Sequence, residues 1–218
     1  MSIGVFIADD HGVVREGLRA LLQLEGDIEV VGDAGDGRDG VRQIARLCPD
    51  VAIMDIAMPE LNGIEATRQI KAVSPSTKVV ILSMHCTSEH VRRALLAGAR
   101  GYVLKESASH EMVSAVRSVH AGGQYLDAAV MELAVDELRD VLRTGQAIPD
   151  PLSPLSARER EVLQLVVEGK STAGIAEILC LAKKSVETYR SRMMAKLGIP
   201  NVVLLTKWAI RHGITTAD

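Results

Sequence analysis

The sequence predicts an α/β domain built on a five-stranded parallel sheet, followed by an all-α domain of four helices. Short apolar stretches and amphipathic stretches alternate five times between Ile3 and His120, and the short connections require parallel strands covered by helices on both faces. Three prolines lie within six residues of the segment TGQAIPDPLSP (144–154), which indicates an extended linker. We therefore expect domains at 1–122 and 152–218, joined by a linker at 123–151.

The two expected domains differ in charge. Residues 1–151 carry 15 basic and 22 acidic side chains, whereas residues 152–218 carry 10 and 6. The net charge of −3 for the whole chain hides this asymmetry. An acidic first part and a basic second part indicate different partners for the two domains.

The composition is that of a globular protein with apolar cores, since 47% of the residues are hydrophobic. No apolar run approaches the roughly 20 residues that a membrane span needs, and the start MSIGVFIADD lacks the features of a signal peptide. The three cysteines are widely spaced and form no CxxC pair, so we expect neither a disulfide framework nor a zinc site. We expect a cytoplasmic protein with reduced thiols and no contact with the membrane.

The expected strands of the first domain are apolar along their length, as strands buried on both faces are. Each is followed by a stretch with apolar residues at helical spacing, such as Val14, Leu18 and Leu22 after the first strand. The strands are expected at Ile3–Ala8, Glu29–Val31, Val51–Met54, Lys78–Met84 and Gly101–Leu104. The helices are expected at Val13–Leu24, Gly40–Leu47, Ile64–Val73, Glu89–Ala97 and His110–His120.

The second domain is expected to be helical throughout. Ser156 and Glu159 have the spacing of a capping box, and Gly169 ends the helix that the box begins. Three further helices are expected at Ser171–Cys180, Lys184–Leu197 and Val202–His212. Within the linker, the amphipathic segment 128–143 predicts one more helix.

Singular polar residues lie where the expected strands of the first domain end. In a parallel sheet these carboxyl ends meet at one edge, and ligand-binding sites of such sheets lie at that edge. Three carboxylates at that edge repel one another unless a cation joins them, and an all-oxygen ligand set suits Mg2+. We expect Asp10 and Asp55 to bind Mg2+ directly, Asp9 to bind it through water, and the Ala57 carbonyl to add one more oxygen.

The same edge offers a phosphoryl acceptor. Asp55 ends the apolar run VAIM and is a competent nucleophile for a phosphoryl group beside a metal ion. Lys105 is placed to stabilise the charge on the transferred group, and Ser83 to donate its hydroxyl to it. Any one of these residues is commonly a cap or a solvated side chain, and His11 is expected only to begin a helix. Their coincidence at one sheet edge favours the functional interpretation.

The segments ADDH, MDIAMPELNG, LSMH and GYVLK resemble the receiver domain of two-component response regulators over residues 1–122. The resemblance implies a flavodoxin-like sheet with strand order 2-1-3-4-5. It implies phosphorylation of Asp55 by a sensor histidine kinase, with Mg2+ as cofactor. It also implies that Tyr102 is a switch residue, which turns inward when Ser83 moves toward the phosphoryl group and so alters the surface of the fourth and fifth helices.

The basic second domain predicts a DNA-reading helix. The segment KKSVETYRSRMMAK (183–196) holds five basic residues and one acid, and a short helix and a tight turn precede it. This is the arrangement of a helix-turn-helix, in which such a helix enters the major groove. A small bundle with a solvated basic face is the simpler alternative, and charge alone would favour it.

A helical projection sorts the side chains of this segment. Val186, Met193 and Leu197 share the core face. On the opposite side, Glu187, Thr188 and Ser191 are expected at base edges. Arg190 projects nearer the core than the other candidates for phosphate contact. Those candidates are Lys184, Ser185, Tyr189, Arg190 and Arg192.

The segment LSARER to KLGI (155–199) resembles the LuxR-type helix-turn-helix over its whole length, and the two domains together resemble the NarL/FixJ family of transcriptional regulators. Tyr189 departs from a common histidine, and Glu187 from a frequent lysine or arginine. The resemblance implies binding of double-stranded DNA, a homodimer in the phosphorylated form, contact with RNA polymerase, and no enzymatic activity beyond slow self-dephosphorylation.

Two other classes of function stay open at this point. A phosphohydrolase of the haloacid-dehalogenase type also uses Asp, Ser and Lys with Mg2+, but it needs a second acid two residues after its nucleophile, where this chain has Ala57. A pure interaction module with an unphosphorylated receiver would need none of the five polar residues at the sheet edge.

Overall fold

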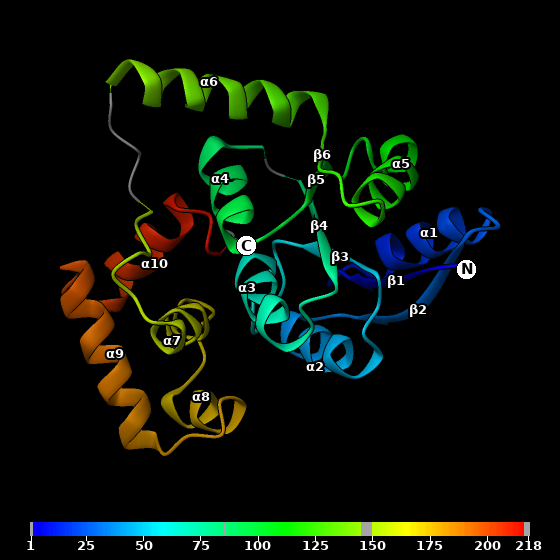
Figure 1. The fold of residues 1–218 in the computed structure, drawn as a ribbon. Helices are drawn as coiled ribbons and strands as arrows, with labels where there is room; N and C mark the ends of the chain where they lie inside the picture. The colour runs from blue at the N-terminus through cyan, green and yellow to red at the C-terminus, as the bar shows by residue number, and fades with distance from the viewer. Residues whose placement is uncertain (1, 85, 145–149, 216–218) are drawn as a thin grey trace. The chain divides into compact units, whose positions relative to one another are not determined.

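The computed structural model describes residues 2–84, 86–144 and 150–215. The chain divides into two compact units, Met1–Ile148 and Pro149–Asp218 (Figure 1). His85 and residues 145–149 of the expected linker lie outside the described residues, as do residues 1 and 216–218 of the expected domains. In the described part of the chain, no helix combines the length and the apolar character that crossing a membrane requires.

The first unit is built on a parallel sheet with strand order β2-β1-β3-β4-β5-β6. The order of the first five strands is confirmed, but the expected total of five is wrong. A sixth strand, β6 (Tyr125–Leu126), pairs in parallel with β5. Two residues give no periodicity, so the sequence carries no signal for this strand. The other strands are β1 (Ile3–Ala8), β2 (Ile28–Ala34), β3 (Val51–Asp55), β4 (Lys78–Ser83) and β5 (Gly101–Leu104).

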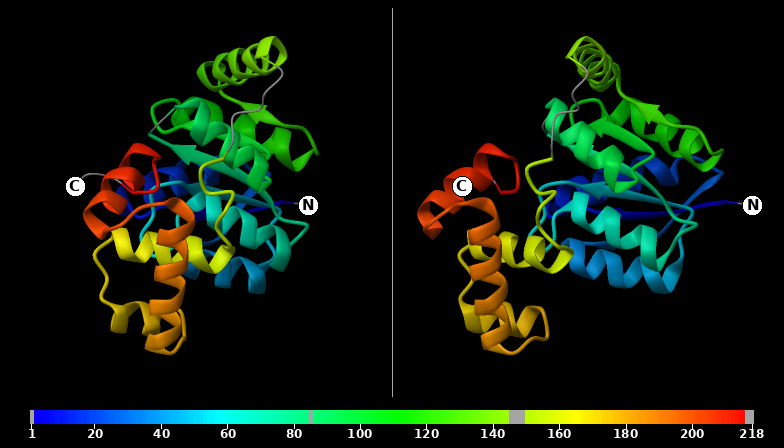
Figure 2. Two further views of the ribbon diagram at one scale, coloured as in Figure 1. Left: turned by 90° about the vertical axis from the view of Figure 1, so that its left-hand side faces the viewer. Right: turned by 60° about the vertical axis from the view of Figure 1, so that its left-hand side comes forward.

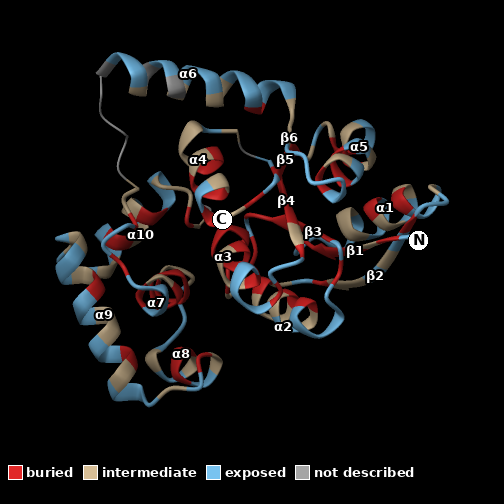
Figure 3. Ribbon diagram, in the orientation of Figure 1, coloured by how far each residue is buried: buried red, intermediate tan, exposed pale blue. Residues whose placement is uncertain are grey.

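Helices cover both faces of the sheet (Figures 1 and 2). The strand residues alternate between two apolar cores, so that Val51 and Ile53 of β3 join one core and Ala52 and Met54 the other. The buried strands at the centre of this unit are evident in Figure 3. One core packs against α1 (Gly12–Gln23) and α5 (Ala108–His120), and the other against α2 (Gly37–Leu47), α3 (Gly63–Val73) and α4 (Ser88–Ala97).

The loop between β3 and α3 is held against the sheet by a close backbone approach at Gly63. A Cβ atom at this position would lie 2.0 Å from the backbone oxygen of Asp55, so only glycine fits. The Gly63 amide donates to the Ile56 carbonyl at 3.0 Å. This approach fixes the chain directly after Asp55.

Helix α6 (Ala128–Thr144) occupies the segment in which a helix near 128–143 is expected. Val130 is fully buried in the same apolar core as α4, and Ala134 packs against that core. Arg92 of α4 forms an ion pair with Glu137 at 2.9 Å. Helix α6 therefore packs as part of the first unit, although the sequence assigns it to the linker.

Over residues 150–215, the second unit has four helices around one apolar core, as expected from the sequence. The capping box is present: the Ser156 hydroxyl accepts from the Glu159 amide, and Glu159 Oε2 accepts from the Ser156 amide at 2.7 Å. Lys196 reaches the same Oε2 atom at 2.7 Å, which ties the third helix of the unit to the first. The helices are α7 (Ala157–Val167), α8 (Thr172–Ile178), α9 (Lys183–Leu197) and α10 (Val202–Arg211).

Candidate functional site

The carboxyl ends of β1 and β3 bring an acidic cluster together. Asp9 is fully buried, Asp55 is 2% exposed, and Asp10 faces solvent. Ligand atoms of Asp9, Asp10, His11 and Asp55 all lie within 4.8 Å of one another. These three aspartates are therefore close enough to share one cation.

Lys105, directly after β5, lies between two of these carboxylates. Its Nζ atom is 2.7 Å from Asp9 Oδ2 and donates to Asp55 Oδ2 at 2.9 Å. Its amide donates to the Ser83 carbonyl at 2.9 Å, which fixes the stem of the side chain against the end of β4. The sheet thus places the expected lysine on the expected aspartates.

The pKa values at this edge reflect burial opposed by charge. Burial raises the pKa of Asp55, and the nearby Asp9 carboxylate raises it further, although Lys105 and the Ala57 amide act in the opposite direction. For Lys105, burial disfavours the ammonium, but the contacts with Asp9 and Asp55 outweigh it and raise the pKa. At neutral pH Lys105 is therefore a fixed positive charge beside Asp55.

Ser83 and Tyr102 form the other side of the site. Both are buried, and their hydroxyl groups are hydrogen-bonded to each other. Burial raises the pKa of Tyr102 above its ordinary value, so its hydroxyl stays protonated. The Tyr102 ring packs in the apolar core shared by α4 and α6. The structure thus has Tyr102 inward and in contact with Ser83.

His11 belongs to this cluster, although the sequence indicates only that it begins a helix. It does precede α1 as the N-cap residue, but its side chain makes no cap hydrogen bond. Instead its Nδ1 atom lies 2.6 Å from Asp10 Oδ1 and 3.3 Å from Asp9 Oδ1. The sequence offers one signal for these contacts, which is that His11 directly follows Asp9 and Asp10. The orientation of the imidazole ring, which the sequence does not show, decides whether the contacts form.

The donor set fits Mg2+. Three carboxylates converge, one of them fully buried, and oxygen ligands are those that Mg2+ prefers. When bound, the ion would neutralise charge on a phosphoryl group at Asp55. Asp9, Asp10 and Asp55 are the residues that would hold it. Ala57 is exposed beside Asp55, and its carbonyl as a further ligand stays a prediction.

Helix α9 presents the polar face that its sequence predicts. Val186 and Met193 are fully buried in the core of the second unit. Ser185, Tyr189 and Arg190 are half-buried. The exposed candidates for DNA contact are Lys184, Glu187, Thr188, Ser191 and Arg192.

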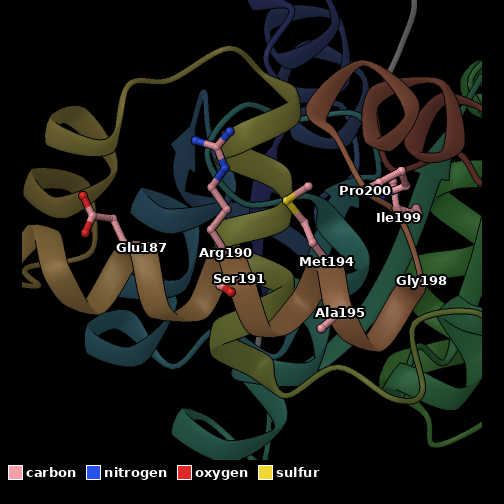
Figure 4. A pocket seen from close by; sticks show the side chains of 8 residues that line it. All are labelled: Glu187, Arg190, Ser191, Met194, Ala195, Gly198, Ile199 and Pro200. Carbon is pink, nitrogen blue, oxygen red and sulfur yellow. The ribbon is translucent and has the colours of Figure 1, made fainter.

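A groove of about 660 Å3 runs along this helix toward the loop that leads to α10 (Figure 4). Glu187, Arg190 and Ser191 line one part of it, and Met194 continues the same side of the helix. Ile199 and Pro200 close the other end. The groove therefore has a polar half on α9 and an apolar half at the loop.

Comparisons with known proteins match each of the two units to a known domain family. The Response regulator receiver domain matches residues 5–117, and the bacterial regulatory proteins of the luxR family match residues 153–209. The chain is 36% identical over 215 residues to the transcriptional regulatory protein MctR of Rhizobium johnstonii, which covers 99% of this chain and 96% of that protein. It is 36% identical over 217 residues to the response regulator UvrY of Escherichia coli strain K12, which covers 99% and 97%.

Among solved structures, the chain is similar to RcsB from Salmonella enterica serovar Typhimurium bound to promoter rprA in the presence of the phosphomimetic BeF3−. The TM-score is 0.61 at 27% identity, covering 95% of this chain and 98% of that one. A receiver followed by a LuxR-type DNA-binding domain defines a transcriptional regulator of the phosphorylation-controlled class. The chain belongs to the NarL/FixJ family of two-component response regulators.

Proposed function

We propose that Asp55 accepts a phosphoryl group from a sensor histidine kinase and that this modification controls DNA binding by α9. The observation that carries the proposal is the position of Lys105, whose ammonium contacts both Asp9 and Asp55 at the carboxyl edge of the sheet. In the transfer, the phosphorus–nitrogen bond of the kinase phosphohistidine breaks. A phosphorus–oxygen bond to an Asp55 carboxylate oxygen forms, and the imidazole keeps the electron pair of the broken bond.

Each residue of the site has a separate role. Asp10, Asp55 and the Ala57 carbonyl would hold Mg2+ directly, and Asp9 would hold it through water. Lys105 moves its ammonium from the Asp55 carboxylate to the oxygens of the attached phosphoryl group. The Ser83 hydroxyl turns toward that group and leaves its partner Tyr102.

The switch reaches α6 through Tyr102. Its backbone carbonyl accepts from the Asp127 amide at 3.0 Å, directly before α6, and its ring shares a core with Val130 of that helix. A change at Ser83 and Tyr102 therefore acts on α4 and α6 together. These helices form the bistable element that phosphorylation biases.

The second unit reads double-stranded DNA as a homodimer in the phosphorylated form. Lys184, Ser185, Tyr189, Arg190 and Arg192 contact phosphates, and Glu187, Thr188 and Ser191 face base edges. RNA polymerase is the further partner through which a bound regulator acts. Because the chromosome and the kinase domain of a bacterial sensor face the cytoplasm, we expect the protein to act there.

The proposal is tested by replacing the expected phosphoryl acceptor, Asp55, and measuring DNA affinity. DNA affinity of the wild-type chain is expected to rise on addition of acetyl phosphate and Mg2+, and Asp55→Asn is expected to abolish the rise while leaving basal binding in place. Asp136→Asn, on the exposed side of α6, is the matched control, because its side chain is 68% exposed. A rise that persists in Asp55→Asn would remove Asp55 as the acceptor.

Hydrolysis of phosphomonoesters is not expected. The position two residues after Asp55 is Ala57, which has no carboxylate to act as a general acid. Incubation with p-nitrophenyl phosphate should release nitrophenol no faster than the slow self-dephosphorylation expected of the site. Sustained turnover would instead assign the site to a phosphohydrolase.

A further inference from the structure

We propose that Glu187 selects a cytosine in each DNA half-site, by accepting a hydrogen bond from the N4 amino group in the major groove. The inference rests on the proposed DNA-reading function of α9 and names the base that one side chain recognises. It arises from the position of Glu187, from the state of its carboxylate and from the groups that surround it.

Glu187 is exposed on α9 and lies about 100° around the helix from the buried Val186. It is in the first half of the helix, where a recognition helix contacts base edges. Figure 4 shows its carboxylate projecting outward from the helix, one turn before Arg190 and Ser191. Glu187 is therefore placed among the residues that would enter the groove.

The Glu187 carboxylate has no hydrogen bond or ion pair among the described residues. Two other acids of the same unit are paired, since Glu159 binds Lys196 and Glu161 binds Arg158. Basic residues precede and follow Glu187 on the helix, but neither Lys184 nor Arg190 forms an ion pair with it. An acid held free among cations has its full accepting capacity for an external donor.

The neighbouring side chains limit what else can read a base at this point. The Thr188 hydroxyl donates to the Lys184 carbonyl of its own helix at 2.8 Å, so its proton is not offered to DNA. Lys184 and Arg192 are exposed and supply the attraction to phosphate that offsets the repulsion of one carboxylate. Glu187 is thus the one negatively charged acceptor on α9, beside the neutral hydroxyl oxygens of Thr188 and Ser191.

A carboxylate only accepts hydrogen bonds, which restricts the base that it can recognise. Guanine and thymine present acceptors in the major groove, and these repel it. Adenine presents its N6 donor next to the N7 acceptor, which opposes the second carboxylate oxygen. Cytosine presents its N4 donor and carries no acceptor of its own on the major-groove edge, so cytosine is the base that Glu187 fits.

The experiment selects random-sequence duplexes with the full-length protein in the presence of Mg2+ and beryllofluoride. The wild-type motif is expected to hold one cytosine column in each half-site, with a preference of roughly 5- to 150-fold over the other bases. Glu187→Ala should flatten that column. Glu187→Gln should move it to adenine, because an amide pairs with both N6 and N7 of adenine.

The matched control is Glu177→Gln, which removes the same charge from an exposed position outside α9 and should leave the column unchanged. An identical motif for wild type and Glu187→Ala would overturn the assignment of Glu187 while leaving α9 as the DNA reader. No enriched motif with the wild-type protein would overturn the DNA-reading function, and this inference with it.

Discussion

At the scale of single residues, the site combines side chains that the sheet places with side chains whose contacts depend on a rotamer. Asp9, Asp55 and Lys105 could be placed at one edge because parallel strands end together. His11 could not, because the direction of an imidazole ring at a helix start depends on its local rotamer. The contact between Ser83 and Tyr102 also depends on a rotamer, and only the family resemblance singled out Tyr102.

Glu159 provides a pH-dependent prediction for the second unit. Burial favours its neutral form, but Lys196 and Ser156 outweigh burial and hold the pKa of this carboxyl below its usual value of 4.5. Its contribution to stability is therefore fully present above that value and is lost as the pH falls through the lowered pKa. We expect Glu159→Gln to lower the free energy of unfolding at pH 7 and to approach the wild type in acid.

The single tryptophan of the chain, Trp208, lies in α10 and reports on unfolding of this unit alone. Urea denaturation followed by its fluorescence at several pH values measures the difference between Glu159→Gln and wild type. Glu177→Gln, at an exposed position, should show no such dependence. A difference that stayed constant from pH 7 to pH 3 would contradict the role of the Glu159 charge.

At the scale of elements, hydrophobic periodicity predicted every long helix and strand, and short-range signals set the boundaries less well. The second strand extends from Ile28 to Ala34, whereas only Glu29 to Val31 was predicted. The prediction stopped too early because the residues after Val31 form no apolar run in this edge strand. β6 was missed because its pairing with β5 is a property of the assembled sheet. Helix α6 was expected, but its packing on α4 rests on Val130 and one ion pair.

The close approach at Gly63 gives a prediction for α3. Gly63→Ala would push the helix away from the Asp55 carbonyl, and we expect it to lower the free energy of unfolding of the first unit by about 2–3 kcal/mol. The same displacement should slow phosphorylation of Asp55. Hydrogen exchange of the β3 amides measures the stability of this unit separately from that of the second.

Gly17→Ala is the matched control. Gly17 lies in α1, and a Cβ atom there meets nothing within 4 Å. This substitution should therefore raise stability by about 1 kcal/mol, as alanine does in an exposed helix interior. Equal effects at Gly17 and Gly63 would show that steric contact with Asp55 is not the determining factor.

At the scale of the whole molecule, charge is divided between the two units. Residues 152–218 carry 10 basic and 6 acidic side chains, in contrast to the acidic remainder. Association with DNA should therefore depend on the second unit. It should weaken as the salt concentration rises, because the release of counterions from DNA then contributes less free energy to binding. The sequence alone predicted this division, because it requires only the order of the charges along the chain.

Arg192 tests that dependence. Arg192→Ala is expected to reduce the slope of log K against log salt by about one, because one phosphate contact is lost. The loss of affinity should be similar for all DNA sequences, in contrast to the base-dependent effect at Glu187. Arg139→Ala, which removes an exposed charge from α6, should leave the slope unchanged. An unaltered slope in Arg192→Ala would place that side chain away from the phosphates.

The packing of β6 and α6 bears on how such a protein exchanges its parts in evolution. A recombination joint at Gly122 would remove the strand beside β5 and the Asp127 amide bound to the Tyr102 carbonyl. It would also strip Val130 from the core that holds the Tyr102 ring. A transplanted receiver that ends there would lose the support of its own switch residue. The contacts that support the switch residue therefore extend beyond the receiver segment itself, into β6 and the first turn of α6.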